Sequence, residues 1–181
     1  YVPLQKSINL ITENATRLRD LFIPMGEYAF SKPLLVQFKY KGKYSGATIH
    51  LYGESNIFDC CRGTTLLYTG TDQFALGLQM NKGTEINNLN IVGQFKAPEF
   101  GSSGYYQLPM EKFTDVNGKC SFMYAGLVID YDGSNAPGGS TGVKVHDVTV
   151  GNFSIDYLIS PNGVTFNADI LIFDNIRCGD A

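Results

Sequence analysis

Charged residues are scarce in this sequence of 181 residues, because Asp, Glu, Lys and Arg together make up 17% of it, against about 25% in an average soluble domain. The formal net charge is −3, and lysines gather only loosely, at Lys39, Lys41 and Lys43. A partner with a phosphate backbone would require a basic surface. The composition therefore argues against nucleic acid as a partner.

Long apolar runs are missing as well. No run approaches the roughly 18 residues that a bilayer-spanning helix needs, and no basic segment followed by an apolar one opens the chain. Hydrophobic residues nevertheless make up 44% of the sequence, which is enough for one folded core. The sequence predicts a single domain over residues 1–181, with no membrane as a partner.

Cysteine is limited to four residues, and their positions form no familiar disulfide or metal pattern. Cys60 and Cys61 are adjacent, so a bond between them would be strained and a Cys-x-x-Cys metal site is impossible there. Cys120 and Cys178 stand alone. We expect these thiols to be buried or idle.

Glycine and aromatic residues are abundant, with 20 Gly, 11 Tyr and 12 Phe, which favours strands separated by tight turns. The runs ATIHLYGE, GTTLLYTG and FALGLQMN are typical of short strands that are buried on one face. Helical spacing occurs only near the start, where the segment from Ser7 to Leu18 predicts a short helix. That helix would cover one end of the domain.

The segment INNLNIVG, which begins at Ile86, recurs as VHDVTVGN and as FDNIRCGD. Three apolar columns align without gaps: Ile86, Val145 and Phe173; Leu89, Val148 and Ile176; Ile91, Val150 and Cys178. The last two copies are 28 residues apart and the first two 59 apart, which means two periods or one period with a large insertion. Repetition in register is typical of a solenoid. A β-sandwich, the rival architecture, also has short strands at regular spacing.

Two further columns follow from the repeat. Setting Gly77 against Gly126 and Asp156 aligns a second set of strands, with Leu78 beside Leu127. A polar column contains Asn88, Asp147 and Asn175. Stacked amide and carboxylate side chains can hydrogen-bond to one another, so this column is expected to be a structural ladder.

The segment FIPMGEYAFSKPL, together with TIHLYGE, TTLLYTG and INNLNIVG, resembles right-handed parallel β-helix proteins of the pectin-lyase-like superfamily. The resemblance extends from about Ile8 to Cys178. It implies an all-β fold, a right-handed parallel β-helix (solenoid) with a short N-terminal capping helix within residues 1–20. Small modules of this superfamily occur in bacteriophage tail spikes. The resemblance thus implies a virion or cell-surface location, a polysaccharide or glycan partner, and a homotrimer.

An inserted loop at residues 94–124 interrupts the repeat, and long insertions in solenoids are often on the binding flank. Aromatic rings offer flat apolar surfaces on which sugars stack. The candidate carbohydrate-binding residues are Phe100, Tyr105, Tyr106 and, beyond the loop, Tyr131. Alternatively, the loop aromatics cover the solenoid or pack against a neighbouring subunit.

Asp130 and Asp132 are the candidates for catalysis. Residues i and i+2 of a strand point to the same face, about 7 Å apart, a spacing that permits an acid/base pair for glycoside hydrolysis. The pair could equally hold Ca2+, the one ion that a lyase of this kind would need, and no other cofactor is expected. The structural alternative is a turn before Gly133 in which the carboxylates cap backbone amides. His50 and His146 are far apart in sequence and suggest no Ser-His-Asp set.

Three hypotheses for function follow. The leading one is a carbohydrate-recognising structural module of a virion appendage or surface protein. The alternative is a polysaccharide depolymerase, a hydrolase or lyase that acts through Asp130 and Asp132. The third is an assembly part whose aromatic loop is buried against a partner chain.

Overall fold

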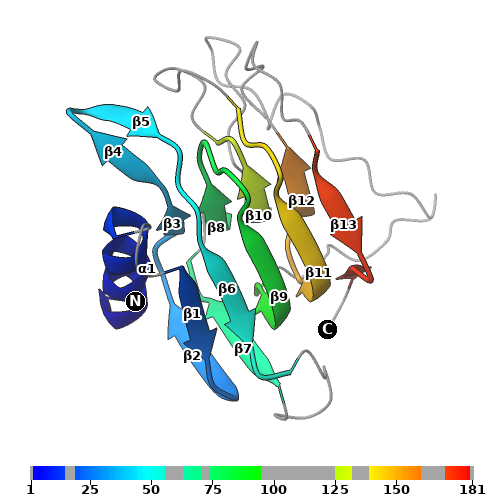
Figure 1. Cartoon of the computed structure of the whole chain (residues 1–181). Coiled ribbons are helices and arrows are strands. Elements are labelled where there is room, and N and C mark those ends of the chain that lie inside the picture. Colours follow the sequence, from blue (N-terminus) through cyan, green and yellow to red (C-terminus); the bar gives the residue numbers. More distant parts are fainter. Residues whose placement is uncertain are drawn as a thin grey trace, which may run out of the picture.

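The computed structural model describes residues 2–14, 19–55, 63–70, 74–94, 125–131, 139–159 and 170–179. This part of the chain consists mainly of β-strands, with one helix, and forms two parallel sheets and a small antiparallel hairpin (Figure 1). The predicted all-β class is confirmed. The inserted loop, from residue 95 onward, lies outside the described residues.

The larger sheet contains β1 (Asp20–Ile23), β2 (Gly26–Phe30), β6 (His50–Gly53), β7 (Thr64–Tyr68), β9 (Glu85–Val92), β11 (Lys144–Gly151), β13 (Ile172–Asp174) and β14 (Arg177–Gly179). The smaller sheet has the order β3 (Leu34–Val36), β8 (Phe74–Leu78), β10 (Ala125–Ile129) and β12 (Ile155–Ile159). Strand pairs in both sheets are parallel. The chain therefore leaves the larger sheet, passes through the smaller one and returns beside its previous strand.

The strand register confirms the alignment of INNLNIVG with its two later copies. Ile86 pairs with Val145 and Val145 pairs with Phe173, while Ile91, Val150 and Cys178 form the equivalent row. Because β9 and β11 pair directly, the separation of 59 residues is one period that contains an insertion.

Leu89 and Val148 pair with each other, are fully buried, and belong to one core cluster against which Ile176 packs. Stacking of equivalent side chains explains why each copy requires an apolar residue at this position.

The second alignment was wrong by two residues between its first two copies. Leu76, not Leu78, pairs with Leu127, although Leu127 does pair with Tyr157 as predicted. A shift of two residues leaves the alternation of inward and outward side chains unchanged. The hydrophobic pattern alone could not reveal the error.

The polar column marks a corner in the larger sheet. Asn88, Asp147 and Asn175 have φ angles of 53°, 54° and 45°, in the left-handed region that Asn and Asp tolerate better than most residues. The side-chain amide of Asn175 donates a hydrogen bond to Asp147, so the predicted ladder is present between these two members. Backbone conformation is therefore a second reason for the residue types in this column.

The helix α1 (Val2–Glu13) begins and ends earlier than the predicted segment from Ser7 to Leu18. Pro3 is compatible with the first turn of a helix, where its missing N–H is not required. Ile8 and Ile11 are buried in the core. The apolar face that the spacing predicted is present, but the helix begins at Val2 and not at Ser7.

Gln5 of α1 completes the hydrogen bonding at the edge of the smaller sheet. Its side-chain Nε2 donates to the carbonyl of Leu35 at 2.9 Å, and its Oε1 accepts from the N–H of Leu35 at 2.7 Å. The side-chain amide thereby makes the two hydrogen bonds that a neighbouring strand would make to Leu35 of β3. It protects a strand edge that would otherwise be open. Figure 1 shows α1 beside β3 and β1.

The sequence did not predict the hairpin of β4 (Phe38–Tyr40) and β5 (Lys43–Ser45). In the sequence, this segment stands out only by the loose group of Lys39, Lys41 and Lys43. Lys39 lies over the ring of Tyr44, 4.4 Å from the centroid, a cation–π contact in which the ring attracts the ammonium group.

Candidate functional site

The larger sheet carries a polar and aromatic strip on its outer face. Two rows of paired residues, here called the outer strip, form it: Asp20, His50, Glu85 and Lys144; Phe22, Tyr52, Asn87, His146 and Asp174. The residues between the two rows, such as Leu51 and Val145, point into the core because successive side chains of a strand alternate. Strands lie about 4.8 Å apart, so a row across five strands is about 19 Å long.

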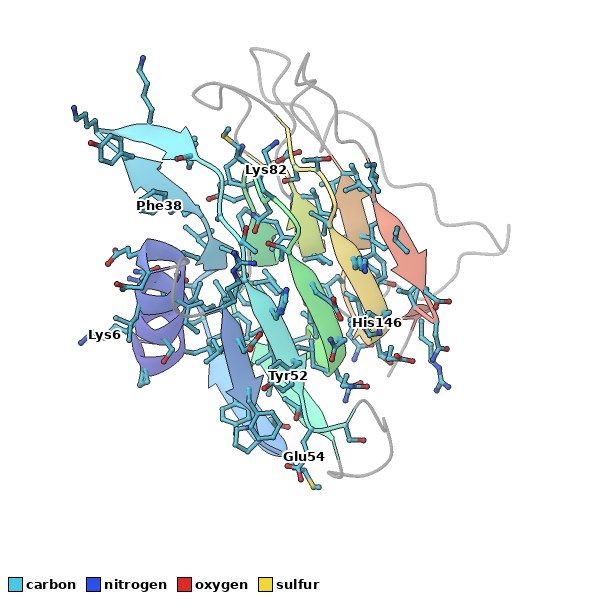
Figure 2. All side chains as sticks on the ribbon, in the orientation of Figure 1. Lys6, Phe38, Tyr52, Glu54, Lys82 and His146 are labelled. Carbon is cyan, nitrogen blue, oxygen red and sulfur yellow. The ribbon has the colours of Figure 1, made fainter. Side chains whose placement is uncertain are left out.

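An apolar platform occupies one end of the outer strip. The rings of Phe22 and Tyr52 have centroids 5.4 Å apart and are tilted by 43°. Phe22 is 46% exposed. Figure 2 shows Tyr52 and His146, on β6 and β11, in the same region of the sheet. An aromatic pair, of which Phe22 is exposed and Tyr52 is half-buried, thus lies in line with hydrogen-bonding side chains.

His146 connects two carboxylates at the centre of the outer strip. Its Nε2 lies 2.8 Å from Oε1 of Glu85, and its Nδ1 lies 2.9 Å from Oδ2 of Asp147. Asn87 donates a further hydrogen bond to Oε1 of Glu85 at 3.2 Å. Both partners of the ring are carboxylates, which accept hydrogen bonds, so this arrangement favours the imidazolium form, in which both ring nitrogens donate.

The pKa values of this cluster shift accordingly. The hydrogen bond with Glu85, followed by that with Asp147, raises the pKa of His146. The hydrogen bond from His146 lowers the pKa of Glu85 and also that of Asp147, to which Asn175 contributes. The protonated ring therefore links β9 and β11, and it is not a free general base.

We expect the substitution His146→Gln to remove a pH-dependent part of the stability. The folded-state pKa of His146 is raised, so its contribution is complete below about pH 6.5, its ordinary pKa, and is lost as the pH rises through the folded-state value. The lowered pKa of Glu85 has the opposite effect on the pH dependence of stability. The stabilisation from Glu85 is lost as the pH falls through the folded-state pKa of its carboxyl group. Denaturation midpoints of wild type and variant should converge as the pH rises from about 6 to 9. A constant difference over that range would contradict the charged bridge.

His50 belongs to the same strip, although no pattern in the sequence indicated that it lies near His146. Its Nδ1 is 2.9 Å from Oδ1 of Asp20, and its backbone pairs with Glu85. Only β9 therefore separates the two histidine-bearing strands. The alignment of INNLNIVG with VHDVTVGN places His146 beside Asn87, but no gapless copy of the repeat contains His50.

The structure buries Asp130 completely. Its Oδ1 accepts hydrogen bonds from the N–H of Met80 at 3.1 Å and from Oγ of Ser140 at 2.7 Å, and its Oδ2 accepts from the N–H of Ser140 at 2.8 Å. This is the turn-capping arrangement weighed as the alternative to catalysis. Asp132 lies outside the described residues, so the catalytic pair stays a prediction.

The predicted carbohydrate-binding aromatics are not gathered into a described site. Phe100, Tyr105 and Tyr106 lie outside the described residues. Tyr131 is 8% exposed, its ring centroid lies 5.0 Å from that of Phe74, and its hydroxyl donates to Gln37 at 2.8 Å. The ring is thus engaged in packing instead of being presented to a ligand.

Among the described residues, no three His, Cys, Asp or Glu side chains are grouped to hold a metal ion, and Ca2+ binding stays a prediction. No described helix is long and apolar enough to cross a bilayer. Of the two states expected for the cysteines, buried or idle, Cys178 is not buried: it is an exposed, free thiol.

Comparison with protein-family models, with curated proteins and with solved structures gives no match. The described residues define an all-β protein with two parallel sheets and a polar, aromatic outer strip on the larger one.

Proposed function

We propose that this chain is a right-handed parallel β-helix whose outer strip binds a polysaccharide. Coiling is supported by the order of the strands: β8, β10 and β12 of one sheet alternate along the chain with β9, β11 and β13 of the other, and each pairs in parallel with its predecessor. Crossover connections between parallel strands are right-handed in about 98% of cases. The handedness follows from that rule.

The observation that carries glycan binding is the ring pair of the exposed Phe22 and the half-buried Tyr52 in line with hydrogen-bonding side chains. Aromatic rings accept the apolar face of a sugar, while amide and carboxylate groups bond to its hydroxyls. Asn87 and Asp174 continue the same row on the next strands. A linear row of this kind suits an extended chain of sugars.

The charges of the outer strip favour a neutral glycan over a uronate polymer. Asp20, Glu85 and Asp174, with the adjoining Asp147, supply negative charge, whereas Lys144 and the protonated His146 supply positive charge. A polyanion would be repelled by the excess of carboxylates. Recognition of a neutral glycan would suit a module on a virion or cell surface.

We expect Tyr52→Ala to weaken binding of neutral polysaccharides by at least about tenfold, which corresponds to about 1.4 kcal/mol. Phe22→Ala should have a comparable effect because the two rings form one platform. Tyr40→Ala is the matched control, since Tyr40 is an exposed tyrosine on the β4–β5 hairpin. Calorimetric titration against a panel of neutral and acidic glycans provides the measurement. Equal losses for Tyr52→Ala and Tyr40→Ala, or no glycan bound by wild type, would reject the proposal.

A further inference from the structure

The two ends of the sheet stack differ in how their edges are covered. At one end, α1 packs against β3 and Gln5 pairs with the β3 backbone. At the other end, β13 and β14 pair only with β11, and β12 pairs only with β10, among the described strands. Figure 1 shows these ends at α1 and at β13. An unpaired edge of this kind is a template for another strand.

Apolar side chains are exposed at the uncovered end. Ile159, Ile170 and Ile172 are 44%, 69% and 45% exposed. Ile172 begins β13, Ile170 lies just before Leu171 and that strand, and Ile159 ends β12. Exposed apolar residues beside open strand edges indicate a surface that is covered in an assembly.

The edge formed by β13 and β14 carries one acidic and one basic residue, so its charges are complementary to those of the same edge in a second copy. Asp174 precedes the corner at Asn175, and Arg177 follows it. Both side chains are exposed on the outer face, in the rows of His146 and Thr149. Neither forms an ion pair with another described residue.

If this edge pairs antiparallel with the same edge of a second copy, the opposite charges of the two copies come together. With a two-fold axis between positions 175 and 176, Asp174 lies opposite Arg177 of the second copy, and Arg177 lies opposite its Asp174. Opposite charges directly across an antiparallel pair are stabilising. On the inner side, the same register places Phe173, which packs on the core, opposite Cys178 of the second copy. Polar residues thus face polar ones and apolar residues face apolar ones.

We infer that this end of the molecule binds a second copy of the chain through a two-fold, antiparallel β-interface. In an isologous contact both subunits use the same surface patch. No further copy can bind there, so the assembly is a closed dimer. At the opposite end, the contact of Gln5 with the β3 backbone keeps the edge of β3 from being free for another strand. Asp174 belongs to this edge as well as to the outer strip, but the inference does not require that a glycan binds.

Charge reversal tests the register of the interface. Sedimentation velocity over a range of concentrations should show a reversible dimer for the wild-type chain. Asp174→Arg and Arg177→Asp, as single variants, should each raise the dissociation constant at least about tenfold because they place like charges opposite each other. The double variant, with the two charges exchanged, should restore association to near the wild-type value.

The matched control is Lys43→Asp, which reverses an exposed charge on the β4–β5 hairpin and should leave association unchanged. Circular dichroism of each variant verifies that the fold is retained. A wild-type chain that remains monomeric at all concentrations would overturn the inference. So would a trimer, as the resemblance implies, or a double variant that associates no better than the single ones.

Discussion

Asp130→Ala should lower the free energy of unfolding by about 4 kcal/mol. The substitution leaves three buried donors without an acceptor, namely the N–H of Met80 and the N–H and hydroxyl of Ser140. Each such loss costs about 1–3 kcal/mol. Alanine also tolerates poorly the positive φ of 56° at this position. Chemical denaturation of wild type and variant measures the difference.

Asp174→Ala is the control for Asp130→Ala, because Asp174 is an exposed aspartate at a strand end. Its effect on the free energy of unfolding should stay within about 0.5 kcal/mol when both proteins are compared as monomers. The comparison also separates a structural from a catalytic role. If Asp130→Ala retained full stability but lost a polysaccharide-degrading activity, the carboxylate would act in catalysis and the turn-capping interpretation would be wrong.

Leu89→Ala should lower the free energy of unfolding by about 3–4 kcal/mol, the range for a fully buried leucine whose cavity does not collapse. Leu89 is fully buried, pairs with Val148 and lies within the main core cluster. Parallel strands on both sides limit the relaxation of the backbone around the cavity. The denaturant midpoint is the measurement.

Leu10→Ala is the matched control for the core, since Leu10 is an exposed leucine on α1. We expect its effect to be below about 0.5 kcal/mol. Equal effects of the two substitutions would mean that Leu89 does not lie in a packed interior column. The stacked arrangement of the repeats would then lose its main support.

The repeat in the sequence was sufficient to predict how β9, β11, β13 and β14 lie beside one another. Stacked strands must place apolar residues at the same depth, so Ile86, Val145 and Phe173 show the register directly. The strand runs at Gly77 and Gly126 were harder because a shift of two residues preserves every inward position. The hairpin of β4 and β5 lies outside the repeat, and nothing in its lysines indicated a strand pair.

The outer strip could not be predicted by the same reasoning. The bond between His146 and Glu85 joins residues 61 positions apart, and it exists only because β9 and β11 adopt one particular register. Sequence spacing instead drew attention to Asp130, whose carboxylate is used by the backbone N–H groups of Met80 and Ser140 and by the hydroxyl of Ser140. A pattern along the chain detects neighbours in sequence, whereas this cluster is made of neighbours across strands.

The corner formed by Asn88, Asp147 and Asn175 has a consequence for how this surface can change. The angle between the two arms of the larger sheet is set by left-handed backbone conformations, not by the side chains on the outer face. Residues such as Tyr52 and Asn87 can therefore be exchanged without reshaping the backbone beneath them. The residues that hold the backbone are thus distinct from those of the outer strip, so the strip of this scaffold could be redesigned while the fold is kept.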